Sequence, residues 1–284
     1  MADEPRDEGA SDGDDSEREQ EEQSEQQAKE AESLDAKTTY EVVRREGMKE
    51  LSRSTSALFW SGLAAGMSMG FSFLAQALIE SHLPDERWRP LLSTFGYSTG
   101  FLIVVLGSQQ LFTENTLTPI IPLLSRKTME CLRNVLRLWG AVLVSNILGA
   151  VLFALALARL DVVPAEVHLA LSSLSSHALA HPFWTMLLHG VYAGWLIALM
   201  VWMLPGAETS KFTVIVVMTY LVGLGGFAHV IAGASEVFYA AFRGEATWGR
   251  VLLGFIVPAL IGNVLGGLTM VASLNHAQAT SGEE

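Results

Sequence analysis

Four ionisable side chains lie within long apolar stretches of this 284-residue sequence: Glu114, His189, His229 and Glu236. A charge at the centre of a bilayer costs about 2.5–3.5 kcal/mol on insertion scales, so such residues usually face a pathway or a partner. His229 is the leading candidate for handling a proton, because an imidazole can donate, accept or carry one near neutral pH. Its alternative role is that of a core histidine bonded to a backbone carbonyl, whereas His189 either faces the pathway or is only a packing residue. We expect Glu114 to cap a helix N-terminus, where a carboxylate is favourable, and Glu236 to lie close to the outer surface.

Two of these side chains stand where an apolar stretch is interrupted by glycine and polar residues. The first interruption covers residues 107–116 and contains Glu114, and the second covers residues 223–229 and ends in His229. In lipid every backbone N–H and C=O must be hydrogen-bonded, so a helix breaks at membrane depth only where protein shields the break or where the break lines a cavity. A matched pair of broken helices is typical of the substrate site in a transporter built from inverted repeats.

The apolar stretches are long enough to span a membrane. Half of the residues are hydrophobic and the mean hydropathy is +0.33, although the net charge is −12. A bilayer core needs about 20 apolar residues per helix. Six segments meet this length and predict an all-α membrane protein, in which the second and fifth segments are too long for one straight helix. The six cover residues 57–80, 91–122, 135–158, 182–204, 212–241 and 250–274.

The negative charge is concentrated at the N-terminus. Residues 1–50 hold 18 acidic and 7 basic side chains, against 12 and 11 in the rest of the chain. This segment is expected to be a mostly disordered cytoplasmic tail, because its first 35 or so residues cannot form a core. Such a tail is either simply solvated or docks a soluble partner. Residues 51–275 form the predicted transmembrane domain, and residues 276–284 form a short cytoplasmic tail.

The orientation follows from basic side chains near the ends of the segments. With the N-terminus inside, nine lysines and arginines lie on the inner side and five on the outer side, and cytoplasmic loops are normally the more basic ones. Residues 1–30 lack the apolar core of a signal peptide, so the first segment is expected to direct insertion. The sequence thus predicts a multi-pass protein of the lipid bilayer with both termini in the cytoplasm.

An internal repeat indicates how the six segments are arranged. Similar residues recur at offsets of 124, 117 and 115, which predicts a duplicated three-helix unit. Because three is odd, the second unit would enter the membrane from the opposite side. The alternative is chance matching of glycines, which also let helices pack closely. The matches are Phe59, Trp60, Leu63, Gly66 and Gly70 with Phe183, Trp184, Leu187, Gly190 and Gly194, then Asn146 with Asn263, and Phe112 with Phe227.

Other kinds of chemistry find no support in the sequence. The single cysteine, Cys131, excludes an internal disulfide and a multi-cysteine metal site. His177 and His181 have i, i+4 spacing but no zinc-protease pattern, and no nucleophile elbow, P-loop or dinucleotide fingerprint occurs. We therefore expect no enzymatic activity, no metal or cofactor, and no nucleic-acid partner.

Three stretches, in order, resemble motifs of the formate/nitrite transporter family, which are channels for small monovalent anions. Residues 107–116 (GSQQLFTENT) resemble its E-L-F-T motif, residues 226–232 (GFAHVIA) resemble G-F-E-H-x-I/V-A-N, and residues 261–267 (IGNVLGG) resemble I-G-N-x-x-G-G. The resemblance covers residues 55–275. It implies an aquaporin-like fold with helices 2 and 5 broken, a homopentamer with one pore per protomer, and a bacterial cytoplasmic (inner) membrane.

The resemblance also implies roles for individual residues. His229 matches the central pore histidine, Thr113 matches the threonine that faces it, and His189 falls where many members have a lysine that attracts anions. The expected pore and substrate-binding residues are His229, Thr113, His189 and Asn263. The expected constrictions are Phe101 with Leu111 on the inner side and Tyr97 with Val222 on the outer side. The expected helix breaks contain Phe112, Glu114, Asn115, Gly226 and Phe227.

The chain departs from the family motifs at Gln110, Glu114, Gly194, Ala228 and Gly233, which indicates a divergent member. The functional hypothesis is a channel or transporter for small anions of weak acids, of the formate or nitrite type, coupled to a proton through His229. A bare anion is expensive to move through an apolar constriction, whereas a neutral acid is not. The alternative is a non-transporting membrane sensor or scaffold with a degenerate pore. A neutral-solute pore of the aquaporin type is disfavoured, because the pair of Asn-Pro-Ala motifs is missing.

Overall fold

The structure is a computed structural model that describes residues 36–268. The regular structure of this range consists of helices, and no strand occurs within it, which confirms the all-α prediction for these residues. The expected disorder of residues 1–35, the end of the sixth apolar segment and the tail at 276–284 lie outside the described residues.

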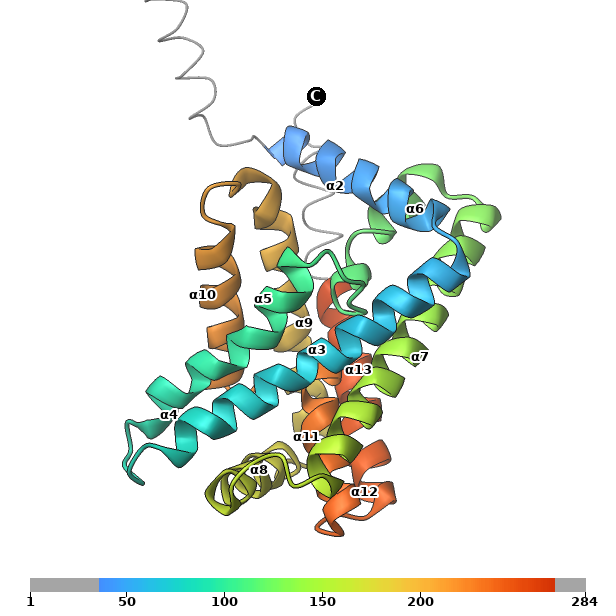
Figure 1. The fold of residues 1–284 in the computed structure, drawn as a ribbon. Helices are drawn as coiled ribbons and strands as arrows, with labels where there is room; N and C mark the ends of the chain where they lie inside the picture. Colours follow the sequence, from blue (N-terminus) through green and yellow to red (C-terminus); the bar gives the residue numbers. More distant parts are fainter. Residues whose placement is uncertain (1–35, 269–284) are drawn as a thin grey trace, which may run out of the picture. The chain divides into compact units, whose positions relative to one another are not determined.

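Helices of very different length follow one another along the chain (Figure 1). Short 3-10 turns separate some of them, namely η1 (Thr94–Tyr97), η2 (Glu114–Thr116) and η3 (Leu204–Gly206), and a π-helical turn, η4 (Leu252–Ile256), joins the last two. The α-helices are α2 (Ala36–Ser52), α3 (Thr55–Ser81), α4 (Arg89–Ser93), α5 (Ser98–Leu106), α6 (Ile120–Arg126), α7 (Met129–Arg159), α8 (Ala165–Ala178), α9 (Phe183–Met203), α10 (Lys211–Leu224), α11 (Val230–Arg243), α12 (Trp248–Val251) and α13 (Val257–Leu265).

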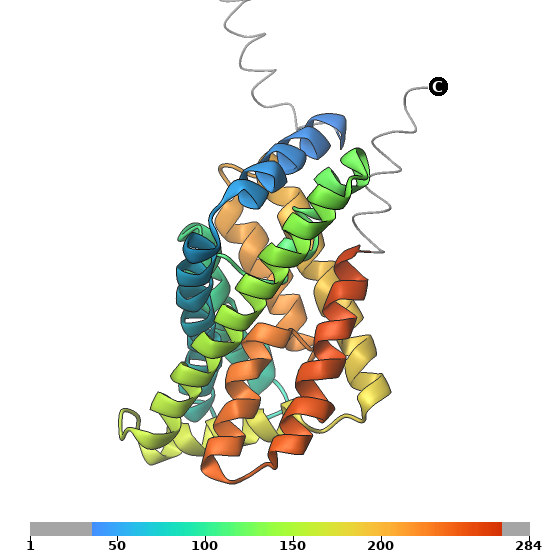
Figure 2. The same ribbon diagram turned by 90° about the vertical axis from the view of Figure 1, so that its right-hand side faces the viewer.

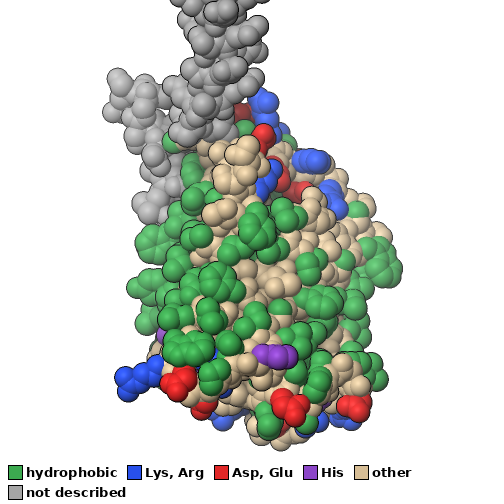
Figure 3. All heavy atoms as spheres, turned by 60° about the vertical axis from the view of Figure 1, so that its left-hand side comes forward, with side chains coloured by type: hydrophobic (Ala, Val, Ile, Leu, Met, Phe, Trp, Pro, Cys, Tyr) green, Lys and Arg blue, Asp and Glu red, His purple; other side chains and the backbone are tan. Residues whose placement is uncertain are grey.

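Several helical stretches are suited to a membrane. Within residues 36–268, five are long and apolar enough to cross one, and a further apolar helix, α10, is shorter. Figure 3 shows hydrophobic side chains over the middle of one face and charged side chains toward its two ends, as a bilayer and its two aqueous sides require. The five stretches are Thr55–Ser81, Arg89–Leu106, Met129–Arg159, Phe183–Gly206 and Trp248–Leu268.

Helix α2 occupies the last part of the expected tail. Residues 36–50 were predicted to belong to a mostly disordered segment, but they form most of this helix. Its buried residues, Thr39, Val43, Gly47 and Leu51, recur every four residues and therefore lie on one side of the helix. That side packs mainly against α6, and in Figure 1 α2 runs across this end of the bundle. Residues 36–50 are therefore part of the folded structure, contrary to the prediction.

Two pairs of helices pack most extensively against each other, α3 with α7 and α9 with α13. Figure 2 shows α7, in green, and the continuous stretch of α12, η4 and α13, in orange to red, running along the length of the bundle. Glycine permits backbone contact in both pairs: a Cβ on Gly66 would overlap the Asn146 carbonyl oxygen, and one on Gly194 would overlap that of Asn263. Gly66 and Gly194 are 128 residues apart. In the structure Gly66 therefore corresponds to Gly194. The sequence comparison, with its offset of 124, paired Gly66 with Gly190, which is about one helical turn away.

Two of the predicted apolar segments, residues 91–122 and 212–241, do not form continuous helices. Helix α5 ends at Leu106 and α6 begins at Ile120, with only η2 between them, while α10 ends at Leu224 and α11 begins at Val230. Each interruption contains a residue with a left-handed backbone, Ser108 with φ 51° and Gly226 with φ 60°. Glycine adopts this conformation readily, whereas it is uncommon for other residues. Backbone N–H and C=O groups in both interruptions therefore lie outside a regular α-helix. They need hydrogen-bond partners from other parts of the chain.

Candidate functional site

The two interruptions meet at one hydrogen bond. Thr113 lies in the first and His229 ends the second, and 2.6 Å separates Thr113 Oγ1 from His229 Nε2. Both side chains are buried, with 0% and 1% of their surface exposed. The structure thus brings together two residues that are 116 positions apart in the sequence.

The contacts of His229 define which ring nitrogen carries the hydrogen. His229 is the N-cap of α11, and its Nδ1 accepts a hydrogen bond of 3.1 Å from the backbone N–H of Ala232. In the neutral ring the hydrogen is therefore on Nε2, which donates it to Thr113 Oγ1. A second proton, on Nδ1, would break the capping bond at a typical cost of about 1 kcal/mol and would place a charge in a buried site. This geometry favours the neutral imidazole.

The Thr113 hydroxyl keeps its own hydrogen. Its oxygen accepts from His229, and no acceptor for the hydroxyl hydrogen is found among residues 36–268. Hydrogen bonds in a chain polarise one another, so a hydroxyl that accepts a bond becomes a stronger donor. The two residues can therefore offer one oriented hydrogen bond to a small anion or acid between the interruptions.

Asn146 of α7 binds the free backbone of the first interruption. Its Oδ1 accepts from the N–H of Phe112 at 2.8 Å, and its Nδ2 donates to the carbonyl oxygens of Gln110 and Gly62 at 2.9 and 2.7 Å. The side chain is fully buried. It links the interruption to α3 and α7, and we call this set of three bonds an asparagine brace.

Asn263 of α13 forms the same brace at the second interruption. Its Oδ1 accepts from the N–H of Val230 at 2.8 Å, and its Nδ2 donates to the carbonyl oxygens of Ala228 and Gly190 at 2.7 and 2.9 Å. Asn263 was expected to bind substrate, but its amide atoms all bind backbone. Its counterpart Asn146 was not among the expected site residues, although the repeated Asn-x-Leu-Gly sequence pointed to it.

A row of aromatic rings adjoins His229. The Phe101 ring packs edge-on against the imidazole with 4.9 Å between ring centres, and Tyr97 packs against Phe101 at 5.5 Å. Two of the expected constriction residues therefore share one chain of contacts with the histidine. The other two, Leu111 and Val222, are fully buried.

Two phenylalanines of the interruptions pack away from this row. Phe112 lies edge-on to Trp139 of α7 with 5.9 Å between ring centres. Phe227 stacks on Tyr192 of α9 at 5.3 Å and helps to line an apolar cavity of about 520 Å³ between α9 and α10. Both rings therefore anchor the interruptions to neighbouring helices.

His189 lies apart from Thr113 and His229. Its Nδ1 is 3.1 Å from the Gly226 carbonyl oxygen, and its ring centre is 4.5 Å from that of His181. The side chain is only partly buried. The structure therefore places His189 beside the second interruption.

Glu114 does not cap a helix. Helix α6 begins at Ile120 without a side-chain cap, because the chain first turns through η2. Glu114 Oε1 is buried and has no hydrogen-bond partner in the described part of the chain. The neighbouring Asn115 is held firmly: its Nδ2 donates to the Gln110 side-chain oxygen at 3.0 Å, and its carbonyl accepts from Trp139 Nε1 at 2.8 Å.

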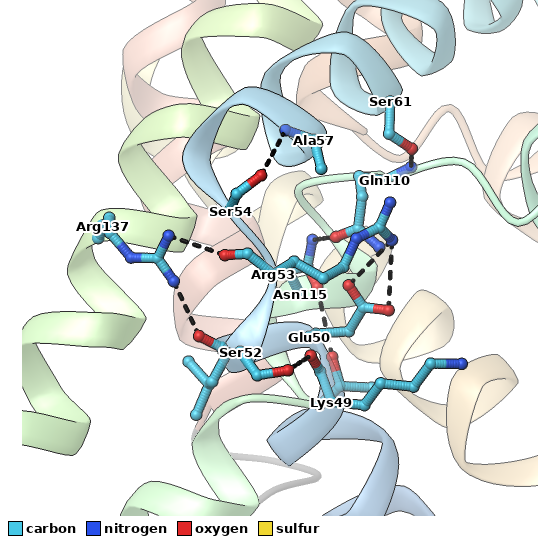
Figure 4. A network of polar contacts seen from close by, with 12 residues as sticks. Lys49, Glu50, Ser52, Arg53, Ser54, Ala57, Ser61, Gln110, Asn115 and Arg137 are labelled. Atoms are coloured by element: carbon cyan, nitrogen blue, oxygen red, sulfur yellow. Dashed lines mark hydrogen bonds and ion pairs between the residues drawn. The ribbon is translucent and has the colours of Figure 1, made fainter.

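Polar contacts join the first interruption to the start of α3 (Figure 4). Arg137 of α7 donates to the carbonyl oxygens of Leu51 and Arg53 at 2.8 and 2.9 Å, which ties the junction of α2 and α3 to α7. In the same view the Ser61 hydroxyl accepts from the N–H of Gln110 at 3.1 Å. The interruption is therefore held by α3 as well as by α7.

Comparison with known proteins shows similarity to one family. Residues 37–277 match the family model described as Formate/nitrite transporter. The chain is 39% identical over 243 residues to Inner membrane protein YfdC of Escherichia coli (strain K12), covering 86% of this chain and 78% of the relative. It is 22% identical over 236 residues to Formate channel FocA of Haemophilus influenzae, covering 74% of this chain and 82% of the relative.

Two solved structures are similar in fold. A pentameric formate channel with formate bound matches with a TM-score of 0.65 and 21% identity, covering 79% of this chain and 97% of that one. An FNT family ion channel matches with a TM-score of 0.72 and 19% identity, covering 85% and 98%. At such low identities the likeness shows a common fold.

Proposed function

Because the chain belongs to the formate/nitrite transporter family, we propose that it is a transmembrane channel or transporter for small anions of weak acids, of the formate or nitrite type. Its relatives are channels and transporters rather than enzymes. The observation that carries the proposal is the buried pair of Thr113 and His229, 2.6 Å apart between the two interruptions. One oriented donor in apolar surroundings suits a small oxyanion or its acid.

The proposed architecture has six membrane segments arranged as two inverted three-helix units, with the second and fifth segments broken. The matching braces of Asn146 and Asn263 support this arrangement, since each binds one interruption in the same way. The fold shared with a pentameric formate channel supports a homopentamer. The relative named as an inner membrane protein supports a cytoplasmic membrane location, and the distribution of basic residues supports cytoplasmic termini.

Passage beside Phe101 and Tyr97 would favour a neutral acid. Moving an unpaired ionised group into such surroundings costs far more than moving a neutral one. With a proton on one oxygen, the acid would use the other to accept from Thr113, which His229 orients. Proton coupling through the imidazole itself would require Nδ1 to release the N–H of Ala232.

Formate uptake into proteoliposomes, read by an internal pH dye, tests this function. Thr113→Val removes the hydroxyl at nearly constant volume, and because one hydrogen bond is worth about 0.5–1.5 kcal/mol we expect uptake to fall roughly 2- to 12-fold. His229→Asn should also fold, since asparagine is a good N-cap, and should lower uptake. Loss of the pH dependence in this variant would assign proton coupling to His229, and its retention would assign coupling to another group.

Thr118→Val provides the matched control, because Thr118 is a buried threonine of the same interruption whose hydroxyl contacts are long, at 3.4 and 3.5 Å. It should transport formate at a rate close to that of the wild type. Wild-type rates in both Thr113→Val and His229→Asn would remove this pair from the mechanism.

The alternative function, a sensor or scaffold with a degenerate pore, was suggested by the departures at Gln110, Ala228, Gly194 and Gly233. Gln110 and Ala228 contribute backbone carbonyls to the asparagine braces, a role that does not depend on the side chain. These two departures therefore leave the braces intact, which favours transport. A wild-type protein that carries none of formate, nitrite, acetate, lactate or hydrosulfide would favour the sensor.

A further inference from the structure

Glu236 is a carboxylate within α11 that the site described above does not use. It follows His229, the N-cap of α11, by seven residues, just under two helical turns, so the two residues lie on the same side of the helix about 10 Å apart along its axis. Other residues define the two flanks of this face: Tyr239 packs against α3 on one side, and Gly233 lies against η4 on the other. Glu236 projects between them.

The carboxylate of Glu236 is unpaired. It forms no hydrogen bond or ion pair with residues 36–268, and only its backbone carbonyl is bonded, by the Ser175 hydroxyl at 2.8 Å. The residue is partly buried. Two turns back along α11, His229 contacts the Phe101 ring, which in turn packs against Tyr97. An ionisable group at such a place in a membrane protein usually marks a proton or ion pathway.

Most charged and titratable groups on the elements around Glu236 are engaged elsewhere, and two others, Arg159 of α7 and Glu166 of α8, are exposed on the surface. On α3 and α4 an acidic and a basic residue pair with each other, the end of α11 has an internal ion pair, and both histidines of α8 are hydrogen-bonded. The contacts are Glu80 with Arg89 at 3.5 Å, Arg243 with Glu245 at 3.8 Å, His168 with the Tyr239 hydroxyl at 2.8 Å, His177 with the Ser173 carbonyl at 2.8 Å, and Arg250 with the Leu179 carbonyl at 3.0 Å.

We propose that Glu236 is the proton-exchanging group of this half of the pathway, an inference that rests on the proposed function. Protonated Glu236 meets an entering anion of a weak acid. The O–H bond of Glu236 breaks, an O–H bond forms on an oxygen of the substrate, and the neutral acid continues past Tyr97 and Phe101 to Thr113. Glu236, left as a carboxylate, takes a new proton from the water on that side, and exit reverses these steps.

Glu236 and the substrate acid have similar acid–base properties. A glutamic acid and a small carboxylic acid ionise in a similar pH range, so a proton moves between them in either direction with little driving force. His229 is less suited to this task, because one ring nitrogen accepts from Ala232 and the other binds Thr113. Ionised Glu236 also repels free anions, so entry should be fastest at acidic pH.

Formate uptake into proteoliposomes, followed by internal acidification at external pH 5 to 8, tests the inference. Glu236→Gln keeps the shape of the side chain but cannot exchange a proton, and its fold is verified by elution volume and thermal unfolding. We expect this variant to acidify the interior at least tenfold more slowly at pH 7 and to lose most of its dependence on external pH. Glu236→Asp should keep the dependence. The control Glu245→Gln alters a carboxylate bonded to Ser172 at 2.9 Å and should match the wild type.

The outcomes separate this inference from the proposed function. Glu236→Gln with the wild-type rate and pH profile overturns the inference and leaves the function standing. A faster rate in this variant shows that Glu236 only repels anions, and it also overturns the inference. A wild-type protein that carries neither formate nor nitrite overturns both. Infrared difference spectra between pH 8 and pH 5 without formate give a separate test, because the band of a protonated carboxyl should weaken in Glu236→Gln, and an unchanged band overturns the inference.

Discussion

At the scale of single residues, the position of Thr113 and His229 depends on side chains that bind backbone. The interruptions contain N–H and C=O groups that water would satisfy in a soluble protein. Here Asn146 and Asn263 satisfy them from 34 and 33 positions away in the sequence. A buried backbone group that loses its partner costs about 1–3 kcal/mol, and each asparagine serves three such groups.

Removing either brace should therefore destabilise the protein strongly. We predict that Asn146→Ala and Asn263→Ala each lower the free energy of unfolding by roughly 3 kcal/mol or more, because three buried groups lose their partner. Thermal unfolding in detergent, followed by tryptophan fluorescence, measures the effect. Ser145→Ala is the control, since this buried neighbour bonds only within its own helix, to the Val142 carbonyl at 3.0 Å. Equal melting temperatures for Asn146→Ala and Ser145→Ala would contradict the role of the brace.

His229 was singled out from the sequence, because an ionisable residue at a break in an apolar run is visible without a structure, whereas Thr113 was assigned only through the resemblance to family motifs. The capping bond of His229 could not be foreseen, and Glu114 was assigned wrongly, since both depend on where the next helix begins. That distance differs between the two interruptions, which cover residues 107–119 and 225–229. The role of His189 in attracting anions stays a prediction.

At the scale of helices, α2 was the hardest to foresee. Its sequence is polar and charged, and its one buried stripe has meaning only once α6 provides a surface to pack against. The long apolar helices were easier, because hydropathy and length define them almost alone. The segment predicted at residues 57–80, for example, is α3, Thr55–Ser81.

The docking of α2 should depend on pH through Glu46. Partial desolvation and, next, the charge of Glu50 raise the pKa of its carboxyl, which stays in contact with solvent. Because the pKa is raised in the docked state, the protonated carboxyl favours docking. This stabilisation is fully present below the ordinary glutamate pKa of about 4.3. It is lost as the pH rises through the raised pKa of the docked state. We predict that Glu46→Gln slows amide hydrogen exchange in α2 at pH 7 relative to the wild type, and that the difference disappears near pH 4.

Glu41→Gln is the control for this experiment. Hydrogen bonds from Arg44 and Arg45 lower the pKa of the Glu41 carboxyl to about 2, so its ionised form stabilises the helix above the ordinary glutamate pKa. Its removal should leave exchange unchanged or make it faster. Slower exchange in both variants would mean that any loss of negative charge stabilises α2.

At the scale of the whole molecule, large apolar side chains remain exposed on the bundle, among them Trp60, Trp184 and Phe212. Either lipid or a neighbouring protomer must cover such a surface. Because the fold is that of a pentameric formate channel, we predict that the detergent-solubilised protein has the mass of five chains of 30.8 kDa. Light scattering after size-exclusion chromatography measures this mass, and a value equal to one or two chains would contradict the pentamer.

The two asparagine braces also have a consequence for biosynthesis. A ribosome adds about 5–20 residues per second, and the brace of each interruption is encoded 34 or 33 residues after the backbone N–H that it binds. At that rate, roughly 2–7 s pass between the synthesis of the backbone N–H group and the synthesis of the asparagine that binds it. A chain that stops between residues 230 and 263 has a closed first interruption and an open second one. Such truncated chains expose unpaired backbone to lipid, and cellular proteolysis should remove them before they join an assembly.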